Sequence, residues 1–408
     1  MERFTGLLGI AAILLIAFLF SNNKKQINYR LVVSGLGLQL FLAILILKVP
    51  PIKAFFQTIG EGMKAIEGYA KEGANFVYGG IASTTMDGVT DFRAPEAFVF
   101  AFNIPATIIL VCVLVAILYH IGIMQRVVAA IARVMNFVMR VSGAEALSNV
   151  ASAFVGQVEA QVMIRPYLAG MTNSELLASM SGSMACIAGG ILIVYVSMGV
   201  PAEYLIAASL MAAPAALVIS KIVFPETEES QTKGKVSVEV KSQYTNIIDA
   251  ISHGASDGMK ISVNVIAMLI GFIALMALIN ALLGMIYPGF GLNTIFGYLF
   301  YPLAWVMGVP SAEVMQVATM MGQKLTINEF VAYTSLIEAK THMSPKALAI
   351  ASFALCGFAN FSSVGIQIGG IGELAPNRRA DLAKLGLRAL LCGTLASYLS
   401  ATIAGILM

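Results

Sequence analysis

The sequence predicts an all-α polytopic membrane protein, and three observations support this fold class. Hydrophobic residues make up 58% of the 408 residues and charged residues only 12%, about half the charged share of a typical soluble domain. The mean hydropathy is +0.85. The apolar residues also gather into runs with about the length of a bilayer crossing, at 5–20, 31–49, 98–121, 176–198, 203–223, 261–287, 347–371 and 386–407. These runs predict eight transmembrane helices.

The first run, residues 5–20, is predicted to be a retained transmembrane helix and not a signal peptide. Glu2 lies where a signal peptide needs a basic region, and no A-x-A cleavage site follows the run. Residues 52–75 carry acids and bases at roughly helical spacing, which predicts an amphipathic helix on the membrane surface. Residues 124–140 predict a second interfacial helix, because three arginines seven residues apart share one face: Arg126, Arg133 and Arg140.

The basic residues predict the topology, because they concentrate on the cytoplasmic side of membrane proteins. They cluster after the first, third and fifth runs and before the eighth: Lys24, Lys25, Arg30, Arg126, Arg133, Arg140, Lys221, Lys233, Lys235, Lys241, Arg378, Arg379, Lys384 and Arg388. Both termini are then expected outside, provided that segments 143–170 and 290–335 each enter and leave on one side. Both segments are therefore predicted to be re-entrant hairpins. The polar segment 225–246 is predicted to be a soluble linker.

The first of these segments carries polar residues inside a membrane-like run. Gln157, Glu159 and Arg165 lie there, next to Gly156, where a helix can break. A carboxylate at membrane depth costs about 3 kcal/mol even on insertion scales. Such a group beside a broken helix is typical of a transporter site. Arg165 is expected to have a structural role.

The chain reads as two similar halves. Each predicted hairpin is followed by an apolar run with a polar, small-residue break, at 181–190 in the first half and at 357–363 in the second. Breaks in corresponding positions indicate a binding site near the midplane of the membrane. The odd number of elements between the halves favours an inverted repeat.

These features divide the chain into four parts. Residues 1–140 are predicted to hold scaffold and interfacial helices, and 141–223 the first hairpin and broken-helix half. Residues 224–287 are predicted to hold the linker and a scaffold helix, and 288–408 the second hairpin and broken-helix half.

Several function classes are disfavoured. The four cysteines show no C-x-x-C spacing and the three histidines lack ligand-spaced partners, so no metal site or other cofactor is expected. The net charge of +3 gives no nucleic-acid signal. An ion channel is the rival from another class, but its filter needs repeated ligands. An enzyme is not expected, because no nucleophile–base–orienter set accompanies Glu159 and Glu329.

Three motifs carry a resemblance to a known family. They are G-Q-V-E-A at 156–160, N-E-F-V-A at 328–332 and G-F-A-N-F-S-S at 357–363. In this order and spacing the sequence resembles the concentrative nucleoside transporter family, essentially end to end. The resemblance implies eight transmembrane helices, two opposed re-entrant hairpins and a homotrimer in the lipid bilayer of the bacterial cytoplasmic membrane. It also implies secondary active symport of nucleosides, with a mobile part that moves like an elevator against a scaffold.

The resemblance further implies the substrate-binding residues. The first hairpin and the fourth span read the nucleobase in this family, and the second hairpin and the seventh span hold the ribose. Matched to the motifs here, the implied residues are Gln157, Val158, Glu159, Glu329, Phe358, Asn360 and Ser363. Their chemistry suits the task, because an amide matches a base edge and a carboxylate accepts from ribose hydroxyls.

Two departures from the family pattern leave the base preference open. Val158 replaces the usual Thr or Ser, and Gln161 stands where the family often has Pro. The first of these changes removes a hydroxyl beside the base.

A third departure concerns the coupling ion. In sodium-coupled members an Asn lies four residues before the motif glycine and a Ser lies in the broken fourth span, but these positions are Ser152 and Cys186 here. Sodium prefers hard oxygen ligands to a thiol. Proton coupling, with Glu159 or Glu329 as the carrier, is therefore predicted. Sodium coupling is the alternative, because backbone oxygens can rebuild a site.

Overall fold

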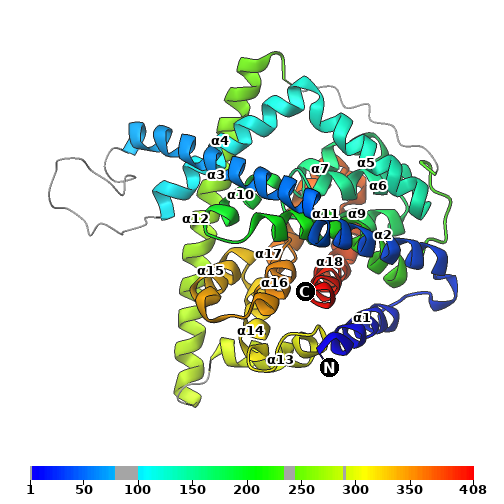
Figure 1. Cartoon of the computed structure of the whole chain (residues 1–408). Helices are drawn as coiled ribbons and strands as arrows, with labels where there is room; N and C mark the ends of the chain where they lie inside the picture. Colours follow the sequence, from blue (N-terminus) through cyan, green and yellow to red (C-terminus); the bar gives the residue numbers. More distant parts are fainter. Residues whose placement is uncertain (1, 79–99, 234–243, 288–290) are drawn as a thin grey trace.

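The computed structural model describes residues 2–78, 100–233, 244–287 and 291–408. The chain is almost entirely helical in these ranges, which confirms the predicted all-α class (Figure 1). Part of the predicted linker 225–246 lies outside the described residues, as does the start of the third apolar run.

The N-terminal part supplies helices at the predicted places. The apolar runs form α1, α2 and α4, whereas α3 and α5 coincide with the predicted amphipathic segments. The bounds are α1 Glu2–Leu19, η1 Lys24–Gln26, α2 Tyr29–Lys48, α3 Pro50–Tyr78, α4 Phe100–Ile121 and α5 Ile123–Met139. Helix α5 buries one face and exposes the other, as expected of an amphipathic helix.

Two short helices follow an irregular turn in the first predicted hairpin, and the next apolar run is broken. The bounds are α6 Gly143–Ser152, α7 Glu159–Val162, α8 Arg165–Leu168, α9 Asn173–Ala185, α10 Gly189–Ser197, α11 Ala202–Val223 and α12 Ile247–Ile286.

The C-terminal half has a similar order of elements, with a second broken run between α16 and α17. The bounds are α13 Leu292–Val306, α14 Val314–Thr326, α15 Glu329–Ala339, η3 Lys340–His342, α16 Pro345–Leu355, α17 Phe361–Leu374, η4 Pro376–Arg378 and α18 Arg379–Leu407.

Within the described residues, each of the eight predicted apolar runs is largely helical. Among the described residues, 6 helical stretches are long and apolar enough to cross a membrane, and Thr5–Leu19 and Pro345–Leu355 are shorter apolar helices. The seventh predicted run, 347–371, is divided into two helices, because α16 ends at Leu355 and α17 begins at Phe361.

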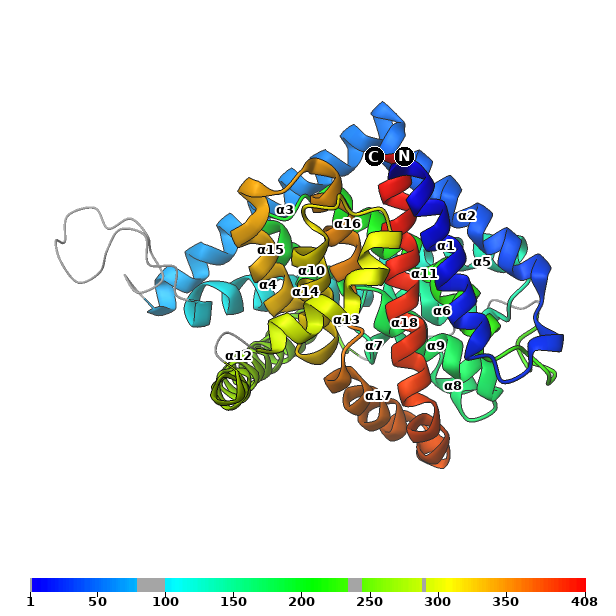
Figure 2. The same cartoon turned by 90° about the horizontal axis from the view of Figure 1, so that it is seen from below.

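Two apolar helices, α11 and α18, lie in the core, whereas a third, α12, lies at the periphery. The apolar windows of α11 and α18 are 94% and 83% buried, and that of α12 is 6% buried. Helix α18 lies in the middle of the molecule beside α1, with the two termini close together (Figure 2). Helix α12 runs along one edge and packs against α4 (Figure 1). Its exposed apolar surface needs lipid or another subunit to cover it.

A buried ion cluster joins three helix ends at the edge of this core. The Lys221 ammonium at the end of α11 lies 2.7 Å from Glu145 and 3.3 Å from Glu226, and it donates to the Ser174 hydroxyl at 2.9 Å. Glu145 also accepts from the Ser142 backbone N–H at the start of α6. The cluster therefore fixes α6, α9 and α11 to one another.

We expect Lys221→Met to lower the free energy of unfolding by about 3–5 kcal/mol, because it leaves a buried Glu145 carboxylate without its partner. Lys71→Met is the control. It removes a surface pair with the partly exposed Glu67 at 2.9 Å, which is worth less than about 1 kcal/mol. Unfolding of both variants in detergent micelles measures the difference, and equal losses would contradict the structural role of the cluster.

Candidate functional site

A buried carboxylate lies where two helices begin. Glu329 is the first residue of α15, and its side chain is buried. The Tyr195 hydroxyl of α10 donates to its Oε1 at 3.1 Å, and the Asn360 amide donates to its Oε2 at 3.1 Å. Each carboxylate oxygen is therefore held by a donor from a different broken helix.

Local sequence explains why both helices start here. Asn328 and Asn360 are N-caps, whose side-chain oxygens accept from the backbone N–H groups of Val331 at 3.0 Å and Ser363 at 2.9 Å. Asparagine is among the best N-cap residues. The two caps bring the N-terminal ends of α15 and α17, which carry partial positive charge, to the Glu329 carboxylate.

The segment predicted to be the first hairpin, residues 143–170, reaches the same site through a glutamine. The Gln157 amide donates to the Ser363 hydroxyl at 3.5 Å, and Gln367 donates to Gln157 Oε1 at 3.3 Å and to the Met180 carbonyl at 3.2 Å. The structure therefore joins four predicted residues in one chain of contacts: Gln157, Ser363, Asn360 and Glu329. We call these four, with Tyr195 and Gln367, the polar cradle.

Two members of the cradle were missed from the sequence. Tyr195 lies in an apolar run without a motif. Gln367 follows Ser363 by four residues and so shares its helix face. That spacing was the available signal, but a buried amide also serves to join helices.

Two of the remaining predicted residues of the binding set, Val158 and Phe358, flank the cradle. The Val158 methyl groups pack against Gly370 of α17, where a Cβ would come within 2.6 Å of them. Phe358 is half-buried in the break before α17 and packs on the core.

The two helix breaks meet at a glycine. Gly357 has a φ of +98°, and a Cβ there would lie 2.2 Å from the Ala185 carbonyl oxygen at the end of α9. The positive φ and the close approach both require a residue without a side chain. The irregular backbone between α16 and α17 is therefore in contact with the end of α9.

Ser152, a predicted coupling-ion residue, belongs to a buried hydrogen-bond network. Its hydroxyl donates to the Ser148 carbonyl at 2.8 Å and lies 2.9 Å from the Ser183 hydroxyl. Gln161 donates to Ser183 at 2.8 Å and accepts from the Ser179 hydroxyl at 2.5 Å. Gln161, one of the departures from the family pattern, thus links two hydroxyls of α9 to the first hairpin.

Cys186, the other predicted coupling-ion residue, lies at the break after α9. Its sulfur is 3.6 Å from the Ser209 carbonyl and 4.0 Å from the Asn149 carbonyl. The Ser209 hydroxyl of α11 lies 3.4 Å from the carbonyl oxygens of Ala153 and Ile187. Sequence reasoning missed Ser209, because nothing local distinguishes it from other small residues of α11.

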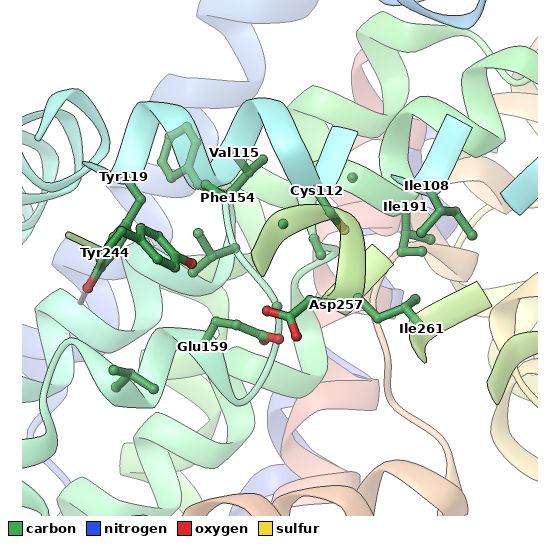
Figure 3. Close-up of a pocket in the computed structure, with 17 residues that line it drawn as sticks. Ile108, Cys112, Val115, Tyr119, Phe154, Glu159, Ile191, Tyr244, Asp257 and Ile261 are labelled. Carbon is green, nitrogen blue, oxygen red and sulfur yellow. The ribbon is translucent and has the colours of Figure 1, made fainter. Parts of the chain in front are cut away.

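Glu159 points to a separate cavity. This cavity of about 330 Å³ lies between the first hairpin, α4, α10 and α12. The carboxylates of Glu159 and Asp257 point toward one another across it (Figure 3). Other groups that titrate also line the cavity: Cys112, Tyr119 and Tyr244. Asp257 lies 3.3 Å from the Lys260 ammonium on the same helix.

The arrangement favours a neutral, polar ligand at the cradle. Its amides and its carboxylate offer both donors and acceptors, and hydroxyl groups on a ligand would satisfy Glu329. In the part of the chain that the structure describes, no group of three or more His, Cys, Asp or Glu residues is placed to hold a metal ion.

Models of one transporter family match most of the chain. Residues 8–81 match the N-terminus and 204–405 the C-terminus of the "Na+ dependent nucleoside transporter" models, and 101–202 match the "Gate: Nucleoside recognition" model.

Individual relatives match over nearly their whole length. The uncharacterized transporter YutK of Bacillus subtilis is 43% identical, with 98% of each chain covered. The nucleoside permease NupC of Helicobacter pylori is 39% identical, with 98% of this chain and 96% of NupC covered. The solved structure of CNTnw in an inward-facing substrate-bound state is 40% identical and covers 100% of this chain and 98% of its own, with a TM-score of 0.93.

We expect Tyr195→Phe to lower the free energy of unfolding by about 1.5–3 kcal/mol, because a hydrogen bond to a charged carboxylate is lost. Tyr333→Phe is the matched control. Its hydroxyl donates to the neutral Ser352 carbonyl at 2.8 Å, so its loss costs about 0.5–1.5 kcal/mol. Unfolding in detergent compares the two, and a smaller loss for Tyr195→Phe would mean that Glu329 carries no charge there.

Proposed function

The chain belongs to the concentrative nucleoside transporter family, and on this premise we propose that it is a secondary active symporter that imports nucleosides with protons. Its relatives are transporters, and it is not an enzyme. We place it in the bacterial cytoplasmic membrane, as for the bacterial relative NupC.

The single observation that supports a nucleoside cargo best is the polar cradle. The Asn360 amide nitrogen lies 3.1 Å from Glu329 Oε2 in a buried site. Vicinal ribose hydroxyls would replace this hydrogen bond with hydrogen bonds to the ligand. Gln157 from the first hairpin is linked to the same site through Ser363. Val158 and Phe358, which flank the cradle, complete the proposed substrate-binding set around the base. Glu159, which the resemblance also placed in this set, lines the separate cavity instead.

We expect Glu329→Gln to abolish or severely reduce nucleoside uptake without loss of folded protein. Loss of a buried charged acceptor should weaken binding by about 1.5–3 kcal/mol. Uptake of labelled uridine into proteoliposomes and its competition by other nucleosides measure the effect.

Glu313→Gln is the matched control for this variant. Glu313 also belongs to the second hairpin segment, and it accepts from the backbone N–H and the hydroxyl of Ser344 at 2.6 Å each. It is outside the cradle, so uridine affinity should be retained. Wild-type affinity in Glu329→Gln would remove Glu329 from the binding site.

Two features support coupling to protons over sodium. The Ser152 hydroxyl is already engaged by Ser148 and Ser183, and Cys186 presents a sulfur where a hard oxygen is needed. The description of the family models names sodium. The oxygens around Ser209 are the groups that would have to complete a sodium site.

Glu159 is the proposed proton carrier. The Asp257 carboxylate faces Glu159 (Figure 3), and a like charge there favours the protonated form of Glu159. The other charged or titratable groups at this place are Cys112, Tyr119, Tyr244 and Lys260. Because Asp257 belongs to α12 and Glu159 to the first predicted hairpin, movement of this segment past α12 would separate the two carboxylates and change the proton affinity of Glu159.

We expect an inward proton gradient alone to drive concentrative uptake, and a sodium gradient alone to drive little. Glu159→Gln should reduce the response to the pH gradient more than it reduces downhill exchange of nucleoside, because it removes the proposed proton carrier. Asp257→Asn should have a smaller effect in the same direction, because it removes the like charge that faces Glu159. Proteoliposome uptake with one gradient at a time measures this. Saturable accumulation also separates a carrier from an ion channel, which would pass a passive current.

Sodium-driven uptake without a response to pH would overturn the proton assignment. The paired variant Ser152→Asn with Cys186→Ser then tests the reason for it. If these side chains are what a sodium site lacks, the pair should confer or strengthen sodium dependence.

We further propose an elevator-like division of the fold. Segments 141–223 and 288–408, with two opposed re-entrant hairpins, would move against a scaffold built from 1–140 and 224–287. The packing of α12 on α4 supports the scaffold, since these helices come from its two parts. The exposed apolar surface of α12 supports a homotrimer, in which other subunits and lipid would cover it.

A further inference from the structure

A buried lysine lies at the second helix break. Lys324 of α14 is 1% exposed. Its ammonium donates to the carbonyl oxygens of Ala354 at 2.9 Å and Cys356 at 2.8 Å. These carbonyls belong to the last turn and the C-cap of α16. The ammonium therefore stands at the negative end of the helix dipole, where a cation is stabilised.

The same break carries both Lys324 and a residue of the polar cradle. Lys324 contacts the Cys356 carbonyl, and Glu329 accepts from Asn360, four residues further along this break. Both side chains are buried, so their opposite charges attract one another with little screening by water. The Cys356 carbonyl that Lys324 contacts also accepts from the Ser397 hydroxyl of α18 at 2.9 Å. One side chain thus satisfies backbone carbonyls that the break leaves without helical partners, and it places a buried positive charge at the break where Glu329 contacts Asn360.

The first break has the same parts but no lysine. At each break a helix ends just before a cysteine: α9 before Cys186 and α16 before Cys356. A serine from a neighbouring helix also lies at each break, Ser209 of α11 at the first and Ser397 of α18 at the second. Residues 149–159, which approach the first break, include no lysine or arginine. The carbonyl oxygens of Ala153 and Ile187 there face a neutral hydroxyl.

We propose that Lys324 is a resident cation of the second repeat. Its ammonium takes the place that a free monovalent cation would need at that break, balances the charge of Glu329 and holds the carboxylate ready for substrate. Only the first break, without such a residue, is then left to respond to a free cation or proton. Lys324 is a positioning residue, because it acts on substrate through Glu329.

This proposal rests on the proposed function only where its test measures uridine binding or uptake. Lys324→Met keeps the length of the side chain and removes its charge. Its affinity for uridine is expected to fall on the order of tenfold to a hundredfold, because one partner of a buried charge pair is removed. Lys324→Ala leaves space for an added amine, and n-propylammonium should restore affinity where tetramethylammonium at equal ionic strength does not.

Lys340→Met is the matched control. The Lys340 ammonium also caps a carbonyl, that of Gly199 at 2.7 Å beyond the end of α10, but it is not part of the cradle. Its uridine affinity should stay at the wild-type value. Wild-type affinity in Lys324→Met would overturn the proposal, whether or not the unfolding temperature falls, because Lys324 would then be a structural cap alone.

A double variant decides the case in which Lys324→Met does not fold. If Lys324 balances Glu329, then Lys324→Met combined with Glu329→Gln should recover folded protein and a higher unfolding temperature than the single variant. Failure of the double variant to recover would overturn the proposal. Absence of uridine uptake by the wild-type protein would overturn the transport function instead, and the unfolding comparison would still decide the role of Lys324.

Discussion

The structure depends on one constraint, which is that backbone N–H and C=O groups at membrane depth need partners inside the protein. An unsatisfied group there costs several kcal/mol. The chain breaks two helices in its interior, after Ala185 and after Leu355, and each break frees such groups. Much of the surrounding chemistry satisfies them. At the first break, the Gly189 N–H donates to the Phe154 carbonyl of the first hairpin at 3.1 Å.

The two breaks meet this constraint with different chemistry. Neutral groups serve the first, where the Ser209 hydroxyl lies among carbonyl oxygens. A charge serves the second, where the Lys324 ammonium contacts two carbonyls. A charge needs a counter-charge in a low-dielectric interior, and Glu329 is within its electrostatic reach. The backbone requirement and the proposed binding site are thus linked in the second half.

Buried charge has two distinct uses in this molecule. Lys221 and Glu145 form a close ion pair at an edge of the core, with further hydrogen bonds to neighbouring loops and helix ends. That pair holds helices together. Glu329 instead accepts from two side chains, Tyr195 and Asn360, whose donors a ligand can replace. Both Glu329 and Glu145 are buried. Glu329 differs from Glu145 because its hydrogen-bond donors are side chains that a ligand can replace.

The sequence by itself determined the all-α class, the places of the apolar helices, the two breaks and the family. These follow from local hydropathy, from helical spacing and from short motifs that carry their own caps, such as Asn328 and Asn360. Tertiary structure alone decided that Tyr195 reaches Glu329, that Asp257 faces Glu159 and that Lys324 serves the second break. These pairs join residues about 30 to 130 positions apart, and the free energy of such a contact depends on helix packing that no local pattern encodes.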